Sequence, residues 1–262
     1  MNRFYKVDTT LDSRRVRVQK PTRRNSLGRA SHHRFFIPLH YEKNYAYPLL
    51  IWLHGPTGCE YEVSQVMPHV SMRNYVAVSP RGSVRHSAVH PNGDPTYTWN
   101  QESRTVETAM EDVLSCISQA TRRFNIAPNR VFLAGNDQGG TMALRLAFAE
   151  PDLFAGVASI GGSLPVTRCP LAKIDAARSL PVLLAAGRDS EQYSVDQVCD
   201  DLRLLHAAGL SVACRQYPCG HEVTTRMLSD LNSWMMEIVS GQPMDCSAEV
   251  DDPTHMRIQD HN

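Results

Sequence analysis

The sequence predicts a single α/β domain with a mostly parallel central sheet flanked by helices. Short apolar runs alternate with longer amphipathic segments through the middle of the chain, which is the pattern of strands and helices in a parallel sheet. Several runs are apolar throughout, as strands buried on both faces are. The chain has 262 residues and is 42% hydrophobic, enough to supply the core of one such domain.

Most of the predicted strands are apolar runs that end at a polar or glycine-containing turn. Continuous runs such as Leu49-Leu50-Ile51-Trp52-Leu53 are typical of buried parallel strands. The strands are predicted, in chain order, over 34–39, 49–53, 75–78, 131–134, 154–160, 181–186 and 210–217.

The segments between these strands predict helices, because their apolar residues recur at helical spacing. The helices are expected over 62–73, 103–124, 141–147, 195–208 and 224–239. Segment 81–100 is polar and contains two glycines and two prolines, so we expect a long loop there. Long loops in compact domains are often functional, and Tyr97 and Trp99 are candidates for a partial lid.

The two ends of the chain differ from the middle in charge. Residues 1–34 hold ten Lys/Arg and two Asp, a net charge of +8, and since the whole chain is neutral the remainder carries −8. We therefore expect a basic arm over 1–32, the α/β domain over 33–240 and an acidic tail over 241–262. A solvated arm is the simpler interpretation, so nucleic acid is not the predicted partner.

Composition excludes several other classes. No apolar run approaches the roughly 20 residues that span a bilayer, and Met1 to Thr10 lacks the apolar core of a signal peptide, so a cytoplasmic protein is expected. The seven cysteines have no paired spacing and predict free thiols instead of disulfides or a zinc site. No metal or organic cofactor is implied, and the sequence leaves the oligomeric state open.

The most informative motif is Gly135-Asn136-Asp137-Gln138-Gly139, which follows the run Val131–Ala134 and precedes a helical segment. This is the strand–turn–helix context of a nucleophile elbow, G-x-S-x-G, whose glycines allow a sharp turn. Aspartate stands where the motif has serine. Asp137 is therefore the candidate for the nucleophile position.

Two further candidates, Asp189 and His221, follow the ends of the next strands along the chain. Carboxyl ends of parallel strands meet at one edge of a sheet, where catalytic groups gather. The order nucleophile, acid, histidine predicts a triad in which His221 is the general acid/base and Asp189 orients it.

These motifs resemble the phospholipase/carboxylesterase family of α/β-hydrolases, which includes acyl-protein thioesterases. The resemblance covers about residues 33–240 and rests on Leu53-His54-Gly55, the elbow, Gly187-Arg188-Asp189 and Gly220-His221-Glu222. It implies an α/β-hydrolase fold without a large cap domain. It also implies oxyanion or substrate-binding groups at Gly55, Thr57 and Gln138. Besides Asp137, the chain departs from the family at Pro56, which has no N–H to offer an oxyanion.

The predicted function is that of a carboxylesterase-like hydrolase acting on a carboxylic ester or related small substrate. Asp137 can attack carbon itself, as the elbow aspartates of dehalogenases and epoxide hydrolases do, or activate a water molecule. The alternative is a catalytically inactive homologue, a pseudoenzyme that binds a ligand or protein in the retained pocket.

Other residues near strand ends have simpler interpretations. Ser163 and Ser190 lack flanking elbow glycines, so neither is predicted to replace the nucleophile. Cys219 lies two residues before His221 but outside the elbow, and His54 is expected to support its loop.

Overall fold

The computed structural model describes residues 32–89, 93–165 and 173–241. They form a seven-stranded sheet in the order β1-β3-β2-β6-β7-β8-β9. Only β1 is antiparallel to its neighbour, so the sheet is mostly parallel, as predicted. The strands are β1 (His33–Phe36), β2 (Tyr47–Leu53), β3 (Val76–Pro80), β6 (Ile126–Asn136), β7 (Gly156–Ile160), β8 (Val182–Gly187) and β9 (Val212–Tyr217).

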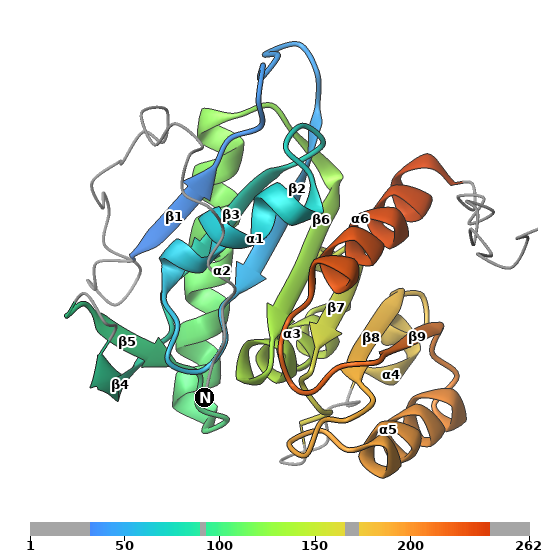
Figure 1. Ribbon diagram of the computed structural model, residues 1–262. Helices are drawn as coiled ribbons and strands as arrows, with labels where there is room; N and C mark the ends of the chain where they lie inside the picture. The colour runs from blue at the N-terminus through green and yellow to red at the C-terminus, as the bar shows by residue number, and fades with distance from the viewer. Residues whose placement is uncertain (1–31, 90–92, 166–172, 242–262) are drawn as a thin grey trace, which may run out of the picture.

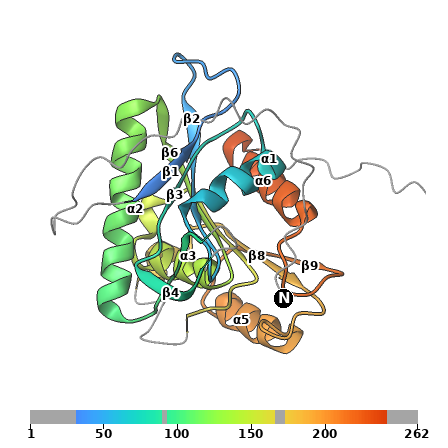
Figure 2. The same ribbon diagram turned by 60° about the vertical axis from the view of Figure 1, so that its left-hand side comes forward.

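Helices cover both faces of the sheet (Figures 1 and 2). Helices α1 (Val63–Val70) and α6 (Thr225–Ser240) pack on one face, and α2 (Ser103–Arg123) and α3 (Gln138–Ala149) pack on the other. Helix α5 (Val195–Ala207) also packs on the α2–α3 face, near the β9 edge. The remaining short helices are η2 (Glu60–Glu62), η3 (Pro151–Leu153) and α4 (Ile174–Ala177).

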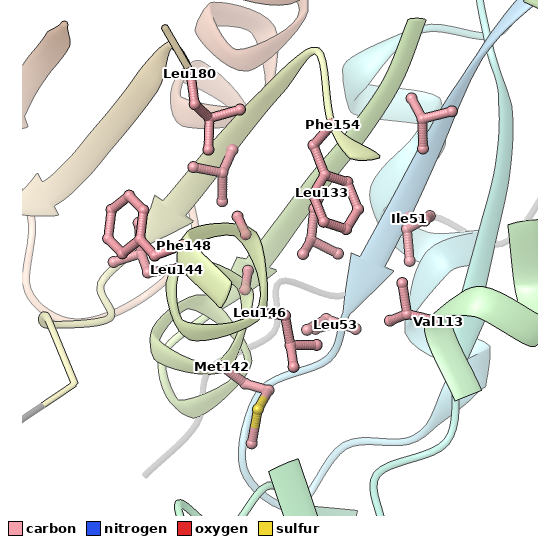
Figure 3. Packing of buried hydrophobic residues seen from close by; sticks show 14 of the residues in the cluster. Ile51, Leu53, Val113, Leu133, Met142, Leu144, Leu146, Phe148, Phe154 and Leu180 are labelled. Carbon is pink, nitrogen blue, oxygen red and sulfur yellow. The ribbon is translucent and has the colours of Figure 1, made fainter. Parts of the chain in front are cut away.

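The core lies in two layers because successive strand residues point to opposite faces. In β2, Leu49, Ile51 and Leu53 pack against the α2–α3 layer. Leu50 and Trp52, between them, pack against α1 and α6. Figure 3 shows the first layer, in which residues of β2 and β6 meet side chains of α2 and α3. Burial of both faces explains why the strand runs are apolar throughout.

The prediction of a structureless loop over 81–100 was wrong. Strands β4 (Val84–Val89) and β5 (Pro95–Thr98) pair antiparallel as a two-stranded sheet outside the main one. Most of the β4 side chains are exposed, so this pair lacks the apolar run that marked the buried strands. Backbone pairing, which composition does not reveal, stabilises it, including a hydrogen bond from Tyr97 N–H to Gly58 O (2.8 Å).

Trp99 is not a lid residue. It is buried, and its indole N–H donates to His54 O at 2.9 Å, so it fastens the segment after β5 to the end of β2. The Tyr97 ring lies under the Arg81 guanidinium, 4.6 Å from the ring centroid. Both aromatic residues therefore support the loop beside the elbow.

The other element predictions are confirmed within a few residues, except that β6 begins earlier than expected, at Ile126. No cap domain occurs in the part of the chain that the structure describes. Within the same ranges, no helix is both long and apolar enough to cross a membrane. The predicted basic arm (1–32) and acidic tail (241–262) fall almost wholly outside the described residues, so both stay predictions.

Helix α3 begins in close contact with the end of β2, and Gly139 makes that approach possible. A Cβ at this position would lie 2.2 Å from Leu53 O and 2.4 Å from His54 O. Backbone atoms at such distances cannot move aside without shifting the strand or the helix. Gly139 therefore sets the position of the elbow against the sheet.

We expect Gly139→Ala to lower the free energy of unfolding by roughly 3 kcal/mol or more, because the added methyl group overlaps backbone. The matched control is Gly241→Ala: Gly241 has φ 67° at the end of α6, and no side chain or other loop among the described residues lies within 4 Å of the added Cβ. That change should cost only the left-handed backbone penalty, about 1–2 kcal/mol. Urea unfolding of both variants measures the difference, and equal losses would contradict the packing argument.

Candidate active site

The carboxyl ends of four parallel strands bring the predicted site residues to one edge of the sheet. Asp137 follows β6, and the loop starting at His54 follows β2. His221 lies beyond β9, and Asp189 and Ser190 lie beyond β8. The strand register pairs Leu53 with Gly135 and Gly187 with Tyr217, so these loops leave the sheet as neighbours.

Asp137 occupies a sharp backbone turn between β6 and α3. Its φ of 50° and ψ of −116° lie in a region that residues with a Cβ rarely adopt. The turn is held by hydrogen bonds from Asp137 N–H to Ile160 O (2.8 Å) and from Thr141 N–H to Asp137 O (2.9 Å). A Cβ on Gly135 would lie 2.4 Å from the carbonyl carbon of Gly139, so the flanking glycines are required. The elbow geometry is thus complete, with a carboxylate at its tip.

The Asp137 carboxylate faces His221. Oδ2 lies 3.1 Å from Nε2, and the two side chains are 29% and 18% exposed. The buried Nε2 atom has no hydrogen-bond partner among the described residues, so the two side chains lie in contact without a well-formed hydrogen bond. The carboxylate of Asp137 remains partly open to solvent.

The other imidazole nitrogen, Nδ1, contacts Ser190. Its Oγ lies 2.8 Å from Nδ1 and also accepts a hydrogen bond from Tyr193 N–H at 3.1 Å. Ser190 is 6% exposed, whereas Asp189 is exposed. Asp189 was expected to orient His221, but the side chain that meets the imidazole belongs to the next residue.

Backbone contacts explain why Ser190, and not Asp189, points at His221. Arg188 N–H donates to Tyr217 O (2.7 Å) and Asp189 N–H to Cys219 O (2.9 Å), so the two loops continue the pairing of β8 with β9. A Cβ on Gly187 would lie 1.7 Å from Gly220 O, which makes glycine necessary at this approach. From the sequence, Ser190 was a candidate only for the nucleophile position. Its place directly after Asp189, beyond the same strand end, made it the neighbouring candidate for an orienting role.

The loop after β2 offers few hydrogen-bond donors to an oxyanion. Gly58 N–H donates to Gly55 O (3.1 Å), with Pro56 and Thr57 (φ 59°) between them, which is a type II turn. Gly55 N–H donates to the carboxyl group of Glu62, at 3.3 and 3.4 Å from its two oxygens. Since Pro56 has no N–H, Thr57 has the remaining amide of the turn.

Gln138 begins α3, and its amide has no hydrogen-bond partner within the described ranges. Its side-chain carbonyl oxygen accepts from the Thr98 hydroxyl. Of the three residues predicted to hold an oxyanion or substrate, Gln138 and Thr57 have amides without a partner in the described part of the chain, whereas the Gly55 amide is bonded to Glu62.

Two buried ionisable residues support the β2 loop. His54 Nε2 accepts from Gly82 N–H at 2.8 Å, so its other nitrogen carries the proton and donates to Gly55 O at 2.8 Å. His54 therefore supports the loop, as predicted. Glu62 accepts from the Trp52 indole N–H at 2.9 Å, and burial raises the pKa of its carboxyl group to about 7.

Cys219 is poorly suited to nucleophilic attack. Burial raises the pKa of its thiol, and the nearby carboxylates of Glu222 and Asp189 raise it further. A thiol with a raised pKa stays protonated at neutral pH and reacts weakly. Among the residues that the structure describes, no group of three or more His, Cys, Asp and Glu is arranged to hold a metal ion.

The elbow, the histidine beyond the last strand and the mostly parallel sheet define an α/β-hydrolase. The chain matches the family model described as "Putative esterase" over residues 24–216, well over half of its length. The protein belongs to this esterase family, in agreement with the resemblance seen in its motifs.

The similar proteins include plant and bacterial carboxylesterases. Carboxylesterase SOBER1 of Arabidopsis thaliana is 26% identical over 147 residues, which cover 55% of this chain and 64% of that protein. Its crystal structure matches 74% of this chain and 100% of the solved chain, with a TM-score of 0.60 and 20% identity. The crystal structure of the Bacillus cereus carboxylesterase matches 79% of this chain and 94% of the solved chain, with a TM-score of 0.61 and 20% identity. The alignment with the SOBER1 sequence thus spans less than two thirds of that protein, and the structures show a shared fold.

The raised pKa of Glu62 predicts a pH-dependent stability. The folded protein keeps this proton up to about pH 7, whereas the unfolded chain loses it near the ordinary value of 4.5. The resulting stabilisation is complete below pH 4.5 and is lost as the pH rises through about 7. Glu62→Gln keeps an oxygen that can accept from Trp52 and cannot ionise. Its free energy of unfolding, relative to wild type, should therefore rise by roughly 3 kcal/mol across this range.

Urea unfolding at several pH values measures this difference, in which the contributions of all other groups cancel. Glu191→Gln, which removes an exposed carboxyl group, is the control. If the difference in the free energy of unfolding between Glu62→Gln and wild type did not change with pH, Glu62 would be ionised in the folded protein over this range, and the prediction would be wrong.

Proposed function

We propose that the protein hydrolyses small carboxylic esters, with the Asp137 carboxylate acting as a general base on a water molecule. The contact of Asp137 with His221 at an intact elbow is the observation that carries this proposal. Membership of an esterase family, and the carboxylesterases among its relatives, support the class of substrate.

In the proposed reaction, Asp137 takes a proton from water as the water oxygen attacks the acyl carbon. The Gln138 amide, and the Thr57 amide opposite, stabilise the oxyanion of the tetrahedral intermediate. When the ester C–O bond breaks, protonated Asp137 returns its proton to the leaving alkoxide. The products are a carboxylic acid and an alcohol, and the enzyme regains its initial protonation state.

Direct attack by Asp137 is the less favourable route. It would form a mixed anhydride on the enzyme, and a second base would then have to activate water to cleave that anhydride. The base mechanism needs only one carboxylate. His221 then stays beside Asp137, with Nε2 at 3.1 Å from Oδ2, and takes no proton in the reaction.

A binding role without turnover is the second candidate, and the β2 loop favours it. Pro56 has no N–H, and the Gly55 and Gly58 amides are already bonded within the protein. Such a site stabilises an oxyanion less well than one with two loop donors, because each missing donor lowers the rate by roughly 100- to 1,000-fold. A small ester-like ligand would still reach the exposed side of Asp137.

We expect Asp137→Asn to lower kcat/KM for short-chain p-nitrophenyl esters by roughly 100- to 10,000-fold, because it removes the base and keeps the side-chain shape. Asp152→Asn, an exposed change on η3, is the control and should act as wild type. If the wild type hydrolyses the esters and Asp137→Asn does so at the same rate, the proposal is contradicted. An inactive wild type would leave the binding role as the better candidate.

A single turnover in H₂¹⁸O tests for direct attack by Asp137 followed by cleavage of the anhydride at the Asp137 carbonyl. The base mechanism places ¹⁸O in the carboxylic acid product and none in the enzyme. Direct attack places ¹⁸O in the Asp137 carboxylate when the anhydride is cleaved at that carbonyl. Mass spectrometry of the peptide that contains Asp137 reads the difference, and we expect an unlabelled peptide.

A further inference from the structure

His221 lies between a hydroxyl group and a carboxylate. The hydroxyl of Ser190 is 2.8 Å from Nδ1, and the carboxylate of Asp137 is 3.1 Å from Nε2. In a Ser–His–Asp triad the carboxylate holds Nδ1–H, and the hydroxyl lies at Nε2 at the tip of the elbow. This chain has the same three side-chain types in contact, with the hydroxyl and the carboxylate on opposite sides of the imidazole.

The hydrogen bonds of Ser190 indicate where the imidazole proton lies. Tyr193 N–H already donates to Ser190 Oγ, so the hydroxyl hydrogen points elsewhere. Ser190 is 6% exposed, and an unbonded buried hydroxyl would be costly. Nδ1 of His221 is the acceptor at hydrogen-bond distance. Donation to Nδ1 leaves the proton of the neutral imidazole on Nε2, the nitrogen that faces Asp137.

Contacts within the β8–α5 loop hold Ser190 in this position. Ser190 N–H donates to Gly187 O at 3.3 Å. Tyr193 is almost fully buried, and its hydroxyl donates to Asp201 at 2.8 Å. Asp201 also accepts from Leu164 N–H at 2.9 Å, which ties the loop to the segment after β7. The orientation of the Ser190 hydroxyl therefore follows from the packing of the whole loop.

We propose that Ser190 is a positioning residue that fixes His221 in its Nε2–H form, and that Ser190, His221 and Asp137 form a triad with the hydroxyl and carboxylate exchanged. Ser190 is too buried to meet a substrate, so it acts through the imidazole. An Nε2 that already holds a proton cannot remove one from a group at position 137. The group there must therefore be its own base, as a carboxylate is.

The role of the exchanged triad in turnover rests on the proposed function, but the exchange itself can be tested alone. The variant Asp137→Ser/Ser190→Asp restores the usual arrangement in this fold. Its readouts are covalent labelling by a fluorophosphonate, which reports an activated serine, and hydrolysis of p-nitrophenyl acetate. The matched control is Asp137→Ser/Ser194→Asp. Ser194 caps α5 by accepting from Gln197 N–H, and aspartate caps equally well.

We expect the exchange variant to be labelled at position 137 and to hydrolyse the ester at least about 100-fold faster than the control or Asp137→Ser alone. The reason is that a triad without its carboxylate loses up to about 10,000-fold in kcat. A folded exchange variant no faster than the control, with a melting curve like wild type, would overturn the proposal. If the wild type and Asp137→Asn are equally inactive while the exchange variant works, the proposed function fails and the exchanged triad stands.

The wild-type protein provides a second test that does not depend on any variant folding. Long-range ¹H–¹⁵N spectra, with His221 assigned by its loss in His221→Ala, report which ring nitrogen holds the proton. For the neutral imidazole we expect Nδ1 to be bare and Nε2 protonated. Observation of Nδ1–H in the wild type would overturn the proposal, because the Ser190 hydroxyl could then not be the donor.

Discussion

The site depends on the backbone turn at Asp137, which holds a residue with a Cβ at a φ of 50° between β6 and α3. The cost of such a conformation, on the order of 1–3 kcal/mol, is met by the packing of Gly135 and Gly139 against neighbouring backbone. This constraint acts on the backbone and does not depend on which side chain position 137 carries. The fold therefore presents a carboxylate in the same place and direction as it would a hydroxyl. The chemistry of the site can change at this position without any change in the sheet or helices around it.

A second constraint acts on the loop after β2, where the protein uses for its own structure the donors that a substrate would need. Glu62 binds the Gly55 amide, and His54 binds the Gly55 carbonyl oxygen from the other side. The turn that follows uses the Gly58 amide. Rigidity of this loop is thus gained at the expense of oxyanion donors. A site that only binds suits such a loop better than one that must stabilise a full oxyanion, so the proposed hydrolysis depends on the amides of Gln138 and Thr57.

The fold was predictable because most of its strands are buried on both faces and stand out as apolar runs between amphipathic helices. The β4–β5 pair was not, since its side chains are largely exposed and its pairing is between backbones. At the site, the places of Asp137 and His221 after β6 and β9 predicted that the two lie together, and the structure brings them into contact. The contact of Ser190 with the imidazole was not predicted, because a carboxylate was expected to orient the histidine and Asp189 lies next to Ser190. Which of two adjacent residues faces an imidazole depends on backbone pairing beyond the strand end, and that pairing is visible only in the structure.

The exchange of hydroxyl and carboxylate links the aspartate at the elbow, Asp137, to the serine at the other side of the imidazole, Ser190. If both position 137 and position 190 held carboxylates, two negative charges would flank one imidazole and favour its cationic form. If both positions held serines, the imidazole would lie between two hydroxyl groups, and no negative charge would stabilise a proton on it. The pair as found keeps one negative charge and one neutral partner, the electrostatic balance that a histidine between them requires. The aspartate at the elbow is therefore half of a compensated arrangement, and its chemistry has to be judged together with Ser190.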